Sequence, residues 1–101
     1  MVRSDYMYTL DLEKGFIEIV DLNQGGMSVT NNIEAVIDEI AEKEGIDTVT
    51  MDVVYRDSEG IWDGYDPILH EFIILNASTL DEAKSLYDIK LAEHYRDWET
   101  T

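Results

Sequence analysis

The sequence predicts an α+β fold, a two-layer sandwich in which a mainly antiparallel sheet of four to five strands carries two helices on one face. Three observations indicate this architecture. Short stretches with alternating apolar side chains are joined by turns that contain glycine, as in hairpins. Two longer stretches carry one apolar stripe at helical spacing, which is typical of helices that cover a sheet. The elements follow the order strand, strand, helix, strand, short strand, strand, helix.

The first two strands are predicted to form a hairpin. Apolar side chains alternate along residues 6–12 and again along 16–22, and three residues ending in Gly15 separate the two runs. Gly15 can adopt the left-handed conformation of such a turn at no steric cost. The next segment contains Gly25 and Gly26 without the Lys-Ser/Thr pair of a phosphate-binding loop, so it is interpreted as a flexible connector.

The first helix is predicted to begin at Asn31 and to end before Gly45. Asn31 can cap the helix, with Glu34 three residues later in the capping-box position. Gly45 supplies the left-handed residue that ends many helices. The apolar stripe comprises Ile33, Val36, Ile37, Ile40 and Ala41. The opposite side carries the acids Glu34, Asp38, Glu39 and Glu42.

The run 68–75 is predicted to be the central strand of the sheet. It contains four consecutive apolar residues, Phe72 to Leu75, so both faces of an extended segment would be apolar. An alternating run at 48–56 and a short strand or ordered loop at 61–65 precede it. The second helix is expected to open at Thr79 with another capping box. Its apolar stripe comprises Leu80, Ala83, Tyr87, Leu91, His94 and Trp98.

Composition predicts one domain over residues 1–101, with 1–5 and 99–101 frayed. The apolar content of 45% is sufficient for one core, and the chain has no cysteine, which excludes disulfides and thiolate chemistry. No apolar segment follows the first residues as in a signal peptide, and no run is long enough to cross a membrane. A soluble, cytoplasmic protein is therefore expected.

Charge is the strongest functional signal in the sequence. Twenty-three acids face seven bases, for a net charge of −16. Such a surface repels nucleic acids and anionic membranes, so direct binding to either is disfavoured. The expected partner is a basic protein. Acidity that serves only solubility is the plainer alternative.

No catalytic or cofactor motif is recognisable. His70 and His94 lie within apolar elements, where a hydrogen-bonded structural role is the commoner one, and no Ser-His-Asp or paired-His spacing is present. The run from Asp57 to Asp66 holds four carboxylates, but their spacing does not fit a calcium loop. We therefore expect no enzyme, metal or cofactor. An enzymatic or metal-binding module at this run and His70 is one alternative.

The preferred hypothesis is a non-catalytic binding protein that engages a basic, nucleic-acid-handling partner and competes with DNA or RNA for it. Carboxylates four residues apart on a helix are separated by about 6 Å, which can imitate part of a phosphate array. By analogy, a phage or mobile-element inhibitor of host defence would need such a small acidic domain. The aromatic residues of the 57–66 run are either a plug over the core or an exposed anchor. The predicted partner-binding residues are Glu34, Asp38, Glu39, Glu42, Asp57, Glu59, Trp62, Asp63, Tyr65 and Asp66.

A second hypothesis is a small structural domain without a ligand, whose acidity serves only solubility. Such a domain would form a homodimer through its sheet or through an apolar patch on the second helix. The candidate residues of that patch are Leu86, Ile89 and Ala92.

Overall fold

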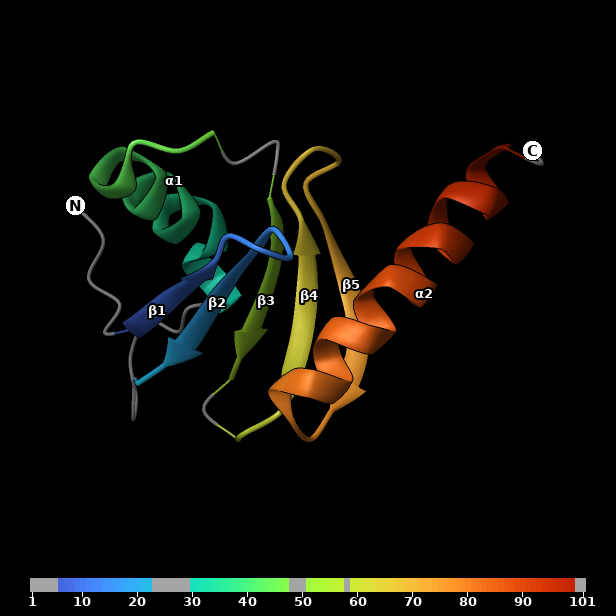
Figure 1. Ribbon diagram of the computed structural model, residues 1–101. Helices are drawn as coiled ribbons and strands as arrows, with labels where there is room; N and C mark the ends of the chain where they lie inside the picture. Colours follow the sequence, from blue (N-terminus) through green and yellow to red (C-terminus); the bar gives the residue numbers. More distant parts are fainter. Residues whose placement is uncertain (1–5, 23–29, 48–50, 58, 100–101) are drawn as a thin grey trace.

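The computed structural model describes residues 6–22, 30–47, 51–57 and 59–99, which form one five-stranded sheet and two long helices (Figure 1). The elements are β1 (Tyr6–Asp11), β2 (Phe16–Asp21), a short 3₁₀ helix (Thr30–Asn32), α1 (Ile33–Glu44), β3 (Asp52–Arg56), β4 (Trp62–Asp66), β5 (Glu71–Ala77) and α2 (Leu80–Glu99). The strands lie in the order β1-β2-β3-β4-β5, and all neighbours are antiparallel except the parallel pair β2 and β3. The α+β class, the element order and the mainly antiparallel sheet are therefore confirmed.

The hairpin of β1 and β2 is also confirmed. Its last pair joins Asp11 to Phe16, and the backbone N–H of Gly15 donates to the carbonyl of Asp11 at 2.8 Å. Gly15 has φ of 76°, so it occupies the left-handed conformation that glycine adopts without strain. The predicted connector at Gly25 and Gly26 lies outside the described residues.

The prediction that both helices cover one face of the sheet is wrong, because they cover opposite faces (Figure 1). Under α1 the core contains Ile17 and Val53, whereas under α2 it contains Phe16 and Val54. Neighbouring residues of a strand point to opposite faces, so these two strands are buried on both sides. The parallel pairing of β2 with β3 requires a crossover connection, and α1 lies in that crossover.

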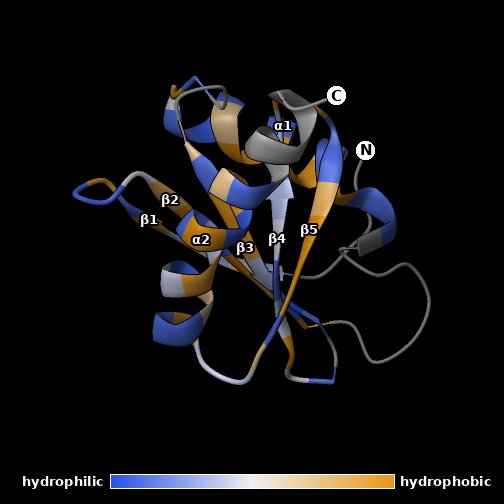
Figure 2. Ribbon diagram, turned by 90° about the vertical axis from the view of Figure 1, so that its right-hand side faces the viewer, coloured by the Kyte–Doolittle hydropathy of each residue, from blue (hydrophilic) through white to orange (hydrophobic). Residues whose placement is uncertain are grey.

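The predicted central strand is wrong as well, since β5 lies at the edge of the sheet and β3 at its centre. On β5, Ile73 and Leu75 are buried against α2, while Phe72 and Ile74 on the other face are 44% and 66% exposed. The buried core beneath α1 draws on β2, β3 and β4 but on no described residue of β5. Apolar side chains on both faces therefore do not make this strand an interior one. Figure 2 shows β5 as an apolar strand at the side of the sheet.

The helix ends match the sequence only in part. The capping box predicted at Asn31 is wrong. A 3₁₀ turn precedes α1, and the N-cap residue of α1 is Asn32, whose side chain makes no capping hydrogen bond. Gly45 ends the helix as predicted, with φ of 66°. At the start of α2, Thr79 Oγ1 accepts the backbone N–H of Glu82 at 3.2 Å, which confirms that half of the second capping box.

Close contact between α2 and β4 depends on Gly64. A Cβ atom at this position would lie 2.7 Å from two ring carbons of Tyr87, which is buried in the core beneath α2. The Tyr87 hydroxyl donates to the carbonyl of Tyr65 at 3.1 Å. Glycine therefore lets the tyrosine ring lie directly on the strand.

No helix in the described ranges is long and apolar enough to span a membrane.

Candidate functional site

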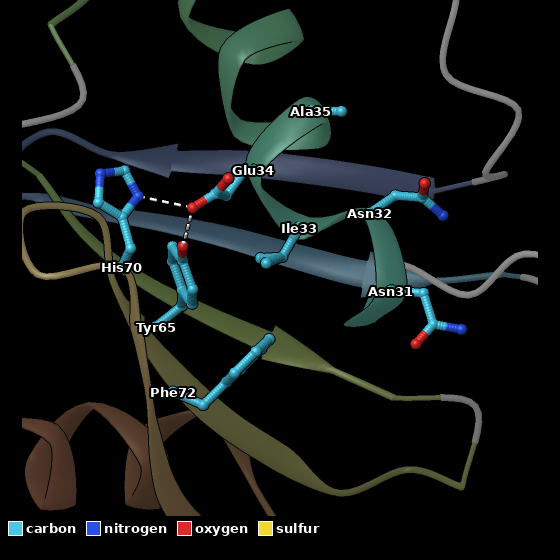
Figure 3. Close-up of a pocket in the computed structure, with 8 residues that line it drawn as sticks. All are labelled: Asn31, Asn32, Ile33, Glu34, Ala35, Tyr65, His70 and Phe72. Carbon is cyan, nitrogen blue, oxygen red and sulfur yellow. Dashed lines mark hydrogen bonds and ion pairs between the residues drawn. The ribbon is translucent and has the colours of Figure 1, made fainter.

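The first turn of α1 and the β4–β5 hairpin meet at the carboxylate of Glu34 (Figure 3). The Tyr65 hydroxyl donates to Glu34 Oε1 at 2.7 Å, and Nδ1 of His70 lies 2.6 Å from the same oxygen. The hydrogen bonds from Tyr65 and His70 lower the pKa of Glu34. Burial and the bond to Glu34 raise the pKa of Tyr65, which keeps the phenol protonated as a donor. The result is an exposed carboxylate held in a fixed position.

These three residues line an open cavity of about 410 Å³. The other lining residues are Asn31, Asn32, Ile33, Ala35 and Phe72. A smaller cavity of about 90 Å³ shares Glu34, Tyr65 and His70 and is also lined by Asp38. Among the residues that the structure describes, neither cavity is lined by a lysine or an arginine. Carboxylates beside an aromatic ring suit a cationic side chain better than an anion.

Two more tyrosines fix carboxylates of α1 from the other side of the helix. The Tyr6 hydroxyl donates to Glu39 at 2.5 Å, and the Tyr8 hydroxyl donates to Glu44 at 2.8 Å. Burial and the bond to Glu39 raise the pKa of Tyr6. Both tyrosines lie on β1, which flanks α1 opposite to β4. The alternation of Tyr6 and Tyr8 was the available sequence signal, but it indicates only a buried face and not these partners.

The remaining acids on the outer side of α1 are Asp38 and Glu42, which are exposed. Together with Glu34 they form a row along the helix, here called the acidic row, with successive residues about 6 Å apart. Within the described chain, no carboxylate of this row pairs with a lysine or arginine. Lys43 is the one base on α1, and its Nζ lies 5.9 Å from the centre of the Tyr8 ring.

The predicted acidic run from Asp57 to Asp66 is not one loop. Strand β4 separates its two ends, and both end carboxylates close turns of the backbone. Asp57 Oδ1 accepts the N–H groups of Glu59 and Ile61 at 2.9 and 3.0 Å. Asp66 Oδ1 accepts the N–H groups at positions 68 and 69, at 2.9 and 3.3 Å. These acids therefore shape the two hairpins at opposite ends of β4.

The other predicted residues of this run also belong to the fold. Asp63 Oδ1 accepts the N–H groups of Leu75 and Asn76 at 2.9 and 3.0 Å, where the register of β4 and β5 shifts. Trp62 is buried in the core beneath α2, so it plugs the core and is not an exposed anchor. Tyr65 and Asp66 are buried too. Among the described residues of the run, only Glu59 is exposed.

A lysine neutralises acids on the opposite face of the sheet. Lys84 Nζ lies 2.8 Å from Asp11 Oδ2 and also contacts the carboxylate of the buried Glu18. Burial lowers the pKa of Lys84, but hydrogen bonds to both carboxylates outweigh this effect and the pKa is raised. The hydrogen bond from Lys84 lowers the pKa of Asp11. This cluster therefore leaves the charge of the α1 face unchanged.

No group of three or more histidine, aspartate or glutamate side chains is placed to hold a metal ion in the described part of the chain. Comparison with protein-family models, curated proteins and solved structures finds no match to this chain.

Proposed function

We propose that the chain is a non-catalytic binding protein that presents the acidic face of α1 to a basic partner. One observation carries this proposal: the acidic row of Glu34, Asp38 and Glu42 is exposed and, in the described ranges, unpaired with lysine or arginine. The cluster around Lys84 lies on the other face of the sheet. The net charge of −16 adds a long-range attraction for cationic surfaces.

The partner that suits this face best is a protein that handles nucleic acid. Such a protein binds phosphates through lysine and arginine, and a row of carboxylates about 6 Å apart offers the same side chains an alternative. Tyr65, Tyr6 and Tyr8 fix three carboxylates of α1 before binding. Side chains that are already ordered lose less conformational entropy on association. In its sharpest form the proposal is a cytoplasmic inhibitor of phage or mobile-element origin that competes with DNA or RNA.

The alternative of a metal-binding or enzymatic module at the Asp57–Asp66 run receives no support. Its end carboxylates lie at opposite ends of β4 and accept backbone hydrogen bonds. No single group of ligands is formed there among the described residues.

Two double variants of equal charge test the proposal. Asp38→Asn with Glu42→Gln neutralises two acids of the acidic row, and Glu13→Gln with Glu93→Gln neutralises two exposed acids elsewhere. Each variant changes the net charge from −16 to −14 (−16 + 2). Partners are captured from lysate of the source cells with the wild-type chain, and the purified pair is then measured by calorimetry over a range of salt concentrations. We expect binding to weaken with salt and to weaken more in the α1 variant.

Competition with nucleic acid completes the test. Duplex DNA or RNA bound by the captured partner should be displaced by the wild-type chain and less effectively by the α1 variant. Equal loss of affinity in both variants would show that only total charge matters. Affinity that does not depend on salt would remove the electrostatic basis altogether.

A further inference from the structure

The cavity at the start of α1 has an aromatic wall that is already held in place by the fold. The ring of Phe72 makes edge-type contacts with the buried rings of Tyr65 and Tyr55, at centroid separations of 5.0 and 6.1 Å. Phe72 is still 44% exposed, and it lines the cavity together with Glu34 (Figure 3). A large aromatic side chain and a carboxylate therefore face the same solvent-filled space.

The carboxylate of Glu34 has one oxygen that is open to a ligand. Oε1 accepts the Tyr65 hydroxyl at 2.7 Å and lies 2.6 Å from Nδ1 of His70. Of the described residues, none is hydrogen-bonded to Oε2. The Glu34 side chain is 59% exposed, so a donor from solvent has access to this oxygen. Asp38 lines the adjoining cavity, which also borders on Glu34, and adds a second negative charge.

The rest of the cavity lining is apolar or carries neutral amides. Its members are Asn31, Asn32, Ile33 and Ala35. The volume of about 410 Å³ lies within the range of roughly 300–1,000 Å³ that is typical of sites for small ligands. The cavity therefore combines a planar apolar wall, an apolar floor and one open carboxylate oxygen.

Two cationic side chains could meet such a carboxylate, and they differ in how they use the wall. The ammonium group of lysine is compact and strongly hydrated, so it gains little from a flat apolar ring. The guanidinium group of arginine is planar and weakly hydrated, and it stacks on aromatic rings while its N–H groups bond to a carboxylate. Its aliphatic stem can also pack on apolar lining. The cavity is therefore better matched to arginine.

We propose that this cavity receives an arginine side chain of the basic partner, stacked on Phe72 and hydrogen-bonded to Oε2 of Glu34. The inference rests on the proposed function, since it names the side chain through which that partner is anchored. The acidic row attracts lysine and arginine alike through charge, whereas the cavity distinguishes between them by shape and hydration. Arginine is also enriched among the residues that dominate binding energy at interfaces.

Blocked tripeptides test the cavity without the partner. Peptides with arginine, lysine or neutral citrulline between two glycines are titrated into the wild-type chain, and the NMR signals of Glu34, His70 and Phe72 are followed. Citrulline has the shape of arginine without its charge. We expect saturable shifts with the arginine peptide, roughly two- to fivefold weaker binding of the lysine peptide, and no saturable shifts with citrulline. Equal affinity for the arginine and lysine peptides, or shifts that never saturate, would overturn the proposal.

Three single variants separate the contacts in the cavity. Phe72→Leu keeps an apolar side chain but removes the ring, so it should weaken the arginine peptide about two- to fivefold and the lysine peptide less. Glu34→Gln keeps an oxygen that can accept the Tyr65 hydroxyl, but it should abolish saturable binding. Glu42→Gln removes the same charge and lines neither cavity, so it should bind the arginine peptide as the wild type does. Equal weakening by Glu34→Gln and Glu42→Gln would refute a specific site.

Binding to the captured partner distinguishes this inference from the proposed function. Glu34→Gln and Glu42→Gln each change the net charge from −16 to −15 (−16 + 1), and Phe72→Leu leaves it unchanged. We expect Glu34→Gln and Phe72→Leu to weaken partner binding more than Glu42→Gln does. Equal losses in the two charge variants, with none in Phe72→Leu, would refute the arginine anchor and leave the acidic row as the binding surface. Partner binding that is lost in Phe72→Leu but unaffected by Asp38→Asn with Glu42→Gln would support the anchor and refute the role of the row.

Discussion

Replacing Gly64 with alanine tests how closely α2 is packed on the sheet. The added methyl group would lie 2.7 Å from Cδ2 and Cε2 of Tyr87, well inside contact distance. The ring is buried and its hydroxyl is bound to the carbonyl of Tyr65, so it has little freedom to move. Overpacking of this kind costs about 1–3 kcal/mol, and the gain of replacing glycine in a strand offsets roughly 0.5–1 kcal/mol. A net loss of about 1–2 kcal/mol should lower Tm by roughly 4–16 °C.

The assay is thermal and urea unfolding of four chains, followed by circular dichroism. They are the wild type, Gly64→Ala, Tyr87→Leu and the double variant. Leucine removes the ring atoms that the methyl group would meet, so the double variant should be less destabilised than the sum of the single changes. A Gly64→Ala chain as stable as the wild type, or strict additivity of the two changes, would show that α2 is not held against β4 at this point.

Two further predictions concern ionisation. Lys84→Met should reduce the loss of stability in acid, because the hydrogen bond from Lys84 lowers the pKa of Asp11. The stability that ionised Asp11 gives the folded chain is present above the ordinary pKa of 3.8 and is lost as the pH falls through the lowered pKa. Urea titrations at several pH values measure this, and an unchanged acid dependence in the variant would contradict it. Tyr65→Phe should raise the pKa of Glu34 toward its ordinary value of 4.5, as observed in a carboxyl NMR titration. Tyr8→Phe, which frees Glu44, is the control and should leave Glu34 unchanged.

Local signals in the sequence predict local structure well. Gly15 and Gly45 mark a turn and a helix end because a left-handed backbone conformation is a property of single residues. The helical stripe of α1 likewise predicts which of its side chains are buried. The hairpin turn, the end of α1 and the buried face of α1 could therefore be inferred from the sequence alone.

The errors arise where the answer depends on distant partners. An apolar run such as 72–75 has the same pattern whether a second layer covers it or leaves it exposed, so periodicity does not distinguish an edge strand from a central one. The face on which each helix lies depends on the parallel pairing of β2 and β3, which joins segments separated by α1. No turn residue or stripe encodes that choice.

The sequence predicts individual residues of the candidate site, but not the contacts between them. Glu34 and Tyr65 were both expected to contact a partner, but their hydrogen bond spans 31 positions of sequence and has no local signature. His70 joins them from a turn where it has φ of 56°, an uncommon conformation for a residue with a side chain. Asp57 and Asp66 resemble free surface charges in the sequence, although aspartate is also a common hydrogen-bond acceptor in turns.

The parallel junction of β2 with β3 also determines how the fold is held together. Every other neighbouring pair of strands is joined by a short turn, whereas about 30 residues connect these two, which costs roughly 3 kcal/mol in closure entropy. Helix α1 bridges the junction, since Tyr6 on β1 binds it at one flank and Tyr65 on β4 at the other. A molecule bound to α1 would therefore stabilise the contact between the N-terminal hairpin and the rest of the sheet. Hydrogen exchange of β2 and β3 amides should slow when such a molecule is bound.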